Sequence, residues 1–136
     1  MVVTARAVQE FAAGPVGIAA ADAFLSDFGT ANGIEERVVF RARVCVAELM
    51  ANALEHGRAH PDADKFTISV AWDQGSTLDL ELADTSNPFD PTRPVRAPDP
   101  ESAGGRGLLL VQGLATRSHY RRDGGSNRVH LQFSAA

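Results

Sequence analysis

A chain of 136 residues is long enough for one domain with a hydrophobic core and too short for two, so we expect residues 1–136 to form a single domain. Charged residues make up 22% of the chain and the net charge is −4 with no long basic run, which argues against nucleic acid as a direct partner. No window approaches the roughly 18 consecutive apolar residues of a membrane span, and no signal-peptide pattern opens the chain. We therefore expect a cytoplasmic protein without a membrane anchor.

The first half of the chain predicts one short strand and two helices. Alternation over residues 2–11 is weak, so the opening strand is short. Between residues 16 and 28 helical spacing is shown by Val16, Ala19, Ala20, Ala23, Phe24 and Phe28. Asn32-Gly33 ends this helix, and a second helix covers about 34–56 with Gly57 beyond its end.

The second half predicts two hairpins separated by a loop and a helix. In 65–82 a strict period of two, around a turn at Gln74-Gly75, indicates one buried face made of Phe66, Ile68, Val70, Trp72, Leu78, Leu80 and Leu82. Residues 85–106 lack periodicity and hold five of the seven prolines, which is typical of a functional or mobile loop. A helix over 107–116 follows. Strands at 118–122 and 128–133 then close the chain around the turn Asp123-Gly124-Gly125-Ser126.

This order of elements predicts the α+β class. The best fit is a two-layer α/β sandwich, in which helices cover one face of a mixed, mainly antiparallel sheet.

The stretch "ELMANALEHG" places polar residues beside the core. Glu48, Asn52 and Glu55 form one stripe on the second helix, about a quarter-turn from its apolar side, where the lone Cys45 is expected to be a buried core residue. A carboxylate one turn from a carboxamide suits magnesium-assisted phosphate chemistry, with the amide oxygen on the metal and the carboxylate acting on a hydroxyl. A solvated helix face explains the same stripe, and His56 is expected to interact with the helix C-terminus.

Asp84 falls on the same face of its strand as the three leucines before it. A carboxylate directed toward the core needs a partner, because an unsatisfied buried polar group costs about 1–3 kcal/mol. That partner could be structural, such as a backbone N–H of the following loop. It could also be a ligand with N–H donors, such as the amine of adenine.

The stretch "SAGGRGLLL" brings glycines to the start of a helix. Gly104, Gly105 and Gly107 would leave backbone N–H groups free at a helix N-terminus, which suits a phosphate. A flexible hinge is the alternative. The stretch is not a P-loop, because no Lys-Ser or Lys-Thr follows the last glycine.

Together these stretches resemble the GHKL ATPase superfamily of gyrase, MutL and histidine kinases, and within it the bacterial anti-sigma-factor serine/threonine-protein kinases. "AELMANALEHG" resembles the N-box, "LADTSNPFDP" the G1 box and "GGRGLLLV" the G2 box, and "GGSNRVHLQF" is similar to the family's last turn and strand. The resemblance covers about Val16 to Phe133. It implies the Bergerat ATP-binding fold.

The resemblance also implies roles for single residues. Glu48 matches the catalytic base, and Asn52 matches the asparagine that binds Mg²⁺. The residues implied to contact ATP are Asn52, Asp84, Phe89, Gly104, Gly105, Arg106, Gly107 and Leu108. Ser86 stands where the G1 pattern has a glycine, so the backbone there has less freedom to approach the base, although the serine hydroxyl could compensate locally.

The implied function is Mg²⁺–ATP-dependent phosphorylation of a serine or threonine of an anti-anti-sigma (STAS-domain) protein that competes with a sigma factor for the kinase, which is expected to be a homodimer. One alternative is a nucleotide-sensing module that sequesters its partner without phosphorylating it. Another is an interaction domain that binds no nucleotide.

Overall fold

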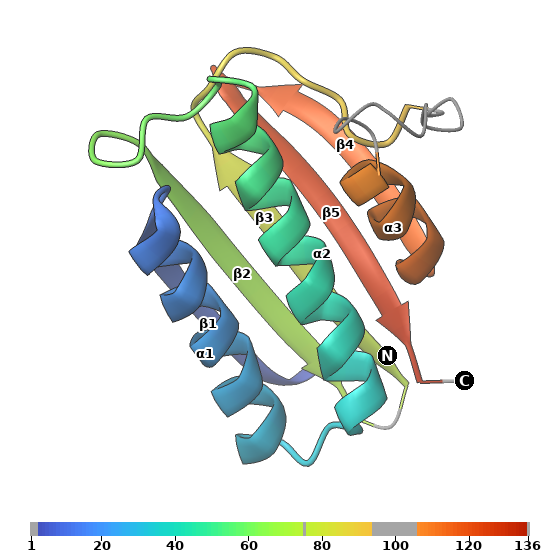
Figure 1. Ribbon diagram of the computed structural model, residues 1–136. Coiled ribbons are helices and arrows are strands. Elements are labelled where there is room, and N and C mark those ends of the chain that lie inside the picture. The colour runs from blue at the N-terminus through green and yellow to red at the C-terminus, as the bar shows by residue number, and fades with distance from the viewer. Residues whose placement is uncertain (1–2, 75, 94–105, 136) are drawn as a thin grey trace.

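The described part of the chain forms five strands and three helices, arranged as Figure 1 shows. The structure is a computed structural model that describes residues 3–74, 76–93 and 106–135. Its elements are β1 (Val3–Ala12), α1 (Pro15–Ala31), α2 (Glu36–Glu55), β2 (Lys65–Asp73), β3 (Thr77–Asp84), α3 (Arg106–Leu114), β4 (Arg117–Asp123) and β5 (Ser126–Ser134). The predicted α+β class, helices and strands are confirmed, although β1 has 10 residues and is not the short strand predicted. Of the loop predicted over 85–106, residues 94–105 lie outside the described residues. Gly75 of the turn predicted at Gln74-Gly75 lies outside the described residues.

The strands form one sheet in the order β1-β2-β3-β5-β4, and each neighbouring pair is antiparallel. Buried and half-buried residues alternate along β5 and through most of β2 and β3, as the period of two predicts. Gly124 and Gly125 have φ values of +55° and +85°, which glycine adopts readily, and they form the turn between β4 and β5. Because β5 returns beside β3, Asp84 lies opposite Asn127.

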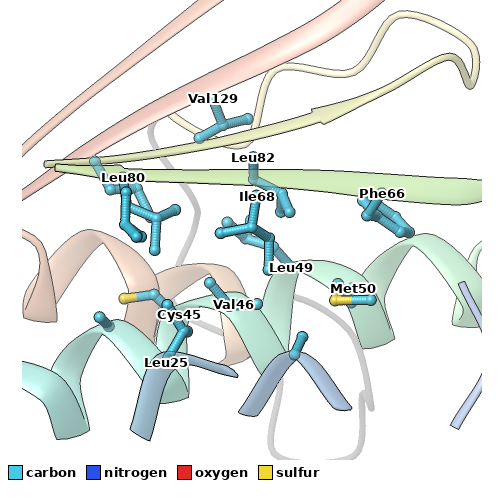
Figure 2. Close-up of a cluster of buried hydrophobic side chains, with 14 of the residues drawn as sticks. Leu25, Cys45, Val46, Leu49, Met50, Phe66, Ile68, Leu80, Leu82 and Val129 are labelled. Atoms are coloured by element: carbon cyan, nitrogen blue, oxygen red, sulfur yellow. The ribbon is translucent and has the colours of Figure 1, made fainter. Parts of the chain in front are cut away.

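All three helices cover the same face of the sheet, and the hydrophobic core lies between the two layers (Figure 1). Figure 2 shows residues of α1 and α2 facing those of the sheet, namely Leu25, Cys45, Val46, Leu49, Met50, Phe66, Ile68, Leu80, Leu82 and Val129. Cys45 is fully buried, as predicted. Burial raises the pKa of its thiol to about 12.

The buried face of α1 differs from the one the sequence predicts. Its buried residues are Gly17, Ala21, Leu25, Phe28 and Gly29, whereas the predicted positions Val16, Ala19, Ala20 and Ala23 are exposed. The reason is close packing through glycine: a Cβ added at Gly17 would overlap the Ala12 carbonyl, and one at Gly29 would overlap Val39. Glycines add nothing to an apolar period, so the periodicity missed this face.

None of the helices in the described ranges combines the length and apolar character needed to cross a membrane.

The C-terminal end of α2, the end of β3 and the start of the 85–93 segment lie at the same end of the sheet (Figure 1). Asn52, in the last turn of α2, and Asp84, the last residue of β3, therefore lie at this end.

Candidate functional site

The polar stripe of α2 enters the interior of the protein. Asn52 is only 8% exposed, Glu48 is half-buried, and Glu55 is exposed. A fully solvated helix face would expose all three, so that alternative does not describe Glu48 and Asn52. His56 is the exposed C-cap of α2, at the helix C-terminus as predicted.

Asp84 has the structural partner that the sequence analysis left open as one alternative. Its Oδ1 accepts hydrogen bonds from the Ser86 backbone N–H at 2.8 Å, from the Ser86 hydroxyl at 2.5 Å and from Asn127 Nδ2 at 3.1 Å. Its Oδ2 has no hydrogen-bond partner among the described residues. One carboxylate oxygen therefore holds the local structure, and the other is available to a ligand.

Asn127 is a buried hub that the sequence analysis did not identify. It is 2% exposed, and its Nδ2 donates to Asp84 Oδ1 and, at 2.9 Å, to the Asn87 carbonyl. Its Oδ1 accepts from the Tyr120 hydroxyl at 2.7 Å. The rule that identified Asp84 could have found it, because Asn127 lies one step before Val129 on the buried face of β5.

Arg58 is the second residue that the sequence analysis missed, and the end of α2 fixes its position. Gly57 has φ +65°, and its N–H donates to the Leu54 carbonyl at 3.1 Å. The Arg58 N–H donates to the Ala53 carbonyl at 2.9 Å, which completes a Schellman motif. The helix-ending glycine thus turns the chain so that Arg58 folds back against α2.

The Arg58 guanidinium lies among three residues implied to contact ATP. Its Nη2 donates to Asn52 Oδ1 at 2.7 Å, and its Cζ lies 3.9 Å from the centroid of the Phe89 ring. Burial lowers the pKa of Arg58, and the negative charge of Asp84 opposes this shift. We call this set of contacts between Arg58, Asn52 and Phe89 the closed arrangement.

The closed arrangement leaves little free space between α2 and β3. The cavity measures about 20 Å³ and is lined by Leu49, Arg58, Phe66, Leu82, Asp84, Phe89, Pro91, Asn127 and Val129. This volume accommodates about one water molecule. A purine base therefore enters only if side chains move, and Arg58 and Phe89 are the polar and aromatic groups in its way.

Glu48 meets the start of α3. A Cβ added at Gly107 would overlap Glu48 Oε2, so the carboxylate lies directly against the second residue of α3. Leu108 packs at the edge of the core. Of the other glycine-loop residues, Gly104 and Gly105 lie outside the described residues, as does the side chain of Arg106.

The donor set fits Mg²⁺ shared with a ligand better than a metal held by protein alone. In the described ranges no group of three or more His, Cys, Asp or Glu side chains could hold a metal ion. Mg²⁺ is often bound by one or two protein oxygens together with waters and phosphate oxygens. The buried amide oxygen of Asn52 is a hard ligand of this kind.

Larger hollows lie on the face of the sheet that the helices do not cover. One measures about 320 Å³ and is lined by ten polar or charged residues and two alanines. Four of its six charged residues pair with one another: Lys65 Nζ lies 3.4 Å from Glu10 Oε1, and Arg128 Nη1 lies 2.7 Å from Glu81 Oε1. The other two are Asp64 and Asp84. The aromatic, amide and carboxylate groups suited to a nucleotide meet between the layers instead.

Comparison with known proteins yields one family and a shared fold. The profile of the family described as "Histidine kinase-like ATPase domain" matches residues 11–133. No curated protein matches the chain.

Several solved structures resemble this chain, including the two that follow. The RsbU and RsbW domains of Rv1364c from Mycobacterium tuberculosis align with a TM-score of 0.67 at 15% identity, over 98% of this chain and 34% of that one. This chain thus spans about a third of its length. The SiaB–SiaC complex from Pseudomonas aeruginosa aligns with a TM-score of 0.59 at 11% identity, over 97% of this chain and 90% of that one. At such identities the likeness concerns the fold alone.

Proposed function

This chain belongs to the histidine kinase-like ATPase domain family, and on that premise we propose that it binds Mg²⁺–ATP and phosphorylates a serine or threonine of a STAS-domain partner. The observation that carries the proposal is the meeting of distant segments at one site. Arg58 lines one cavity with Asp84 and Phe89 and donates to Asn52 Oδ1, and Glu48, one turn before Asn52 on α2, lies against Gly107.

Each residue has a chemical task in this proposal. Asp84 Oδ2 would accept a hydrogen bond from the adenine amine, and backbone N–H groups of Gly104, Gly105 and Gly107 would bind phosphate oxygens. Asn52 would hold Mg²⁺, which when bound neutralises charge on the phosphates. Arg106, Leu108 and Phe89 would complete the contacts with ATP.

Glu48 would act on the nucleophile. The partner's hydroxyl oxygen forms a bond to the γ-phosphorus while the bond between that phosphorus and the β,γ-bridging oxygen breaks, so that ADP leaves. The hydroxyl proton passes to the Glu48 carboxylate. Catalysis of this kind depends mainly on positioning and charge stabilisation.

The partners follow from the family resemblance. We propose that the STAS protein and a sigma factor compete for this chain, and that phosphorylation releases the STAS protein. The structures of the RsbU and RsbW domains of Rv1364c and of the SiaB–SiaC complex share the fold of this chain, and the partner-switching role is proposed from the family resemblance. Homodimerisation belongs to the same proposal, as does a cytoplasmic location. The exposed Val16 on α1, 84% accessible, marks a candidate partner surface.

A binding module without phosphoryl transfer is the second candidate. Ser86, at the position where the G1 pattern has glycine, favours it, because reduced backbone freedom near the base would position ATP less well for transfer. Glu48 argues against it, because a half-buried carboxylate beside Gly107 serves no purpose in a pure binder.

Calorimetric titration with Mg²⁺–ATP, followed by incubation with ATP radiolabelled on the γ-phosphate and a STAS protein, tests the proposal. We expect saturable binding and label on the STAS protein. Binding without label on any candidate partner would leave the second candidate. Absence of both binding and a thermal shift with ATP or ADP would indicate an interaction domain that uses no nucleotide.

Gly107→Ala should impair transfer by moving Glu48. The new Cβ would displace the carboxylate, and we expect about a tenfold lower transfer rate with little change in unfolding temperature. Gly113→Ala on the same helix is the matched control, because an added Cβ there meets nothing within 4 Å. Equal transfer rates in the two variants would contradict the contact between Glu48 and the reacting group.

A further inference from the structure

We propose that Arg58 is a built-in competitor for the nucleotide site: in the ligand-free protein its guanidinium takes the positions of the metal and the base, and it must swing away for Mg²⁺–ATP to bind. This inference rests on the proposed nucleotide-binding function and adds its regulation. Arg58 belongs to none of the three motifs that the sequence analysis identified.

Arg58 already occupies the proposed metal ligand. The proposed Mg²⁺ ligand, Asn52 Oδ1, already accepts a hydrogen bond from Arg58 Nη2 at 2.7 Å. A guanidinium is charged at all physiological pH values, and two cations on one amide oxygen repel each other. Arg58 and Mg²⁺ are therefore alternative occupants of Asn52.

Arg58 also occupies the space that a base would need. Arg58 stacks on Phe89 with its Cζ 3.9 Å from the ring centroid, and it is attracted by the charge of Asp84. An adenine that bonds to Asp84 inside the cavity would need this same space, because only about 20 Å³ is free. The flat guanidinium thus occupies the place of a flat base.

The buried guanidinium of Arg58 is incompletely hydrogen-bonded, which favours its departure from the site. Its Nε is buried without a hydrogen-bond partner in the part of the chain that the structure describes, and an unpaired buried donor is unfavourable. Burial also lowers its pKa, so water would solvate the charge better. The Schellman motif at Gly57 fixes the backbone, so only the side chain has to rotate.

Displacement of Arg58 affects the neighbouring 85–93 segment. Phe89 belongs to a segment that Asn127 holds from β5 and that Gln112 holds from α3, by donating to the Pro91 carbonyl at 2.9 Å. When Arg58 leaves, Phe89 loses its cation–π partner. Nucleotide binding is thereby coupled to the contact between this segment and α3, whose first turn faces Glu48.

Arg58→Met tests the proposal, because methionine keeps an apolar stem beside Phe89 but has neither the charge nor the donor. We expect it to bind Mg²⁺–ATP about tenfold more tightly than the wild type, since apparent affinity rises with the fraction of protein whose site is open. With EDTA in place of Mg²⁺ the gain should be smaller, because competition at Asn52 is then absent. Arg43→Met is the control, since Arg43 pairs with Asp22 at 2.8 Å between α1 and α2.

Each outcome decides between the two proposals. Wild-type binding with equal or weaker binding by Arg58→Met would overturn the competition and leave the nucleotide function standing. Failure of both proteins to bind any nucleotide would overturn both. Arginine side-chain NMR of the wild type is a second measurement that does not depend on the variant's folding: the Arg58 guanidinium signals should show restricted rotation without ligand and lose it at saturating Mg²⁺–ATP. Unchanged signals at saturation would overturn the proposal.

Discussion

Replacing Glu48 with glutamine should lower phosphoryl transfer by about 10²- to 10⁴-fold and leave Mg²⁺–ATP affinity within about threefold. Glutamine has the shape of glutamate but cannot take up the hydroxyl proton. Glu48 has no hydrogen-bond or ion-pair partner within the described ranges, so the substitution breaks no contact that holds α2 or α3. Transfer of label to the STAS partner and calorimetry on the same preparations measure the two effects separately.

Glu55→Gln is the matched control for this experiment. Glu55 lies on the same stripe of α2 but is exposed, so its replacement removes the same charge without touching the cleft. Full transfer activity in Glu48→Gln would show that another group takes the proton. Loss of nucleotide binding in Glu48→Gln would instead indicate that Glu48 contributes to ATP binding and would contradict its role as a base.

Most of the fold follows from local patterns. In β2 and β3 a strict period of two predicts one buried face, and the structure buries Ile68 and Leu80 completely. The Gly124-Gly125 turn was also predictable, because glycine readily accepts two successive positive φ values. The orientation of α1 was not readable, because Gly17 and Gly29 allow a close approach that no apolar period records.

The candidate site divides in the same way. Asp84 stood out because a carboxylate interrupted an apolar face, and Asn127 obeys the same rule on β5. Arg58 could not be predicted. It follows a helix end and shows no period, and its meaning arises only where α2 comes within reach of Phe89, which lies 31 residues further along the chain.

The pairing within the site explains how Ser86 fits where the family's pattern has glycine. Its hydroxyl and backbone N–H both donate to Asp84 Oδ1, which orients the carboxylate and leaves Oδ2 free. Arg122 donates to the Ser86 carbonyl at 2.6 Å and holds the same segment from β4. The serine hydroxyl therefore fixes the orientation of the Asp84 carboxylate.

Asp84→Asn should weaken Mg²⁺–ATP binding by about 100-fold, or ~2.8 kcal/mol, while lowering the free energy of unfolding by no more than about 1 kcal/mol. Asparagine can keep its Oδ1 as the acceptor for Ser86 and Asn127, so the local network survives. It replaces Oδ2 with an NH₂ group, and this donor would face the donating amine of adenine. Calorimetry and chemical denaturation of the ligand-free protein measure the two quantities.

The preference for ATP over GTP provides a second measurement for Asp84→Asn. An NH₂ group at residue 84 can donate to the carbonyl of guanine, so the preference for ATP over GTP should shrink in Asp84→Asn. Asp90→Asn is the control, because Asp90 lies in the same segment and accepts from the Thr92 backbone N–H at 2.8 Å. Comparable losses of affinity and stability in Asp84→Asn would mean that both carboxylate oxygens are structural. In that case the cleft between α2 and β3 has no acceptor for a base, and the nucleotide proposal loses its specificity.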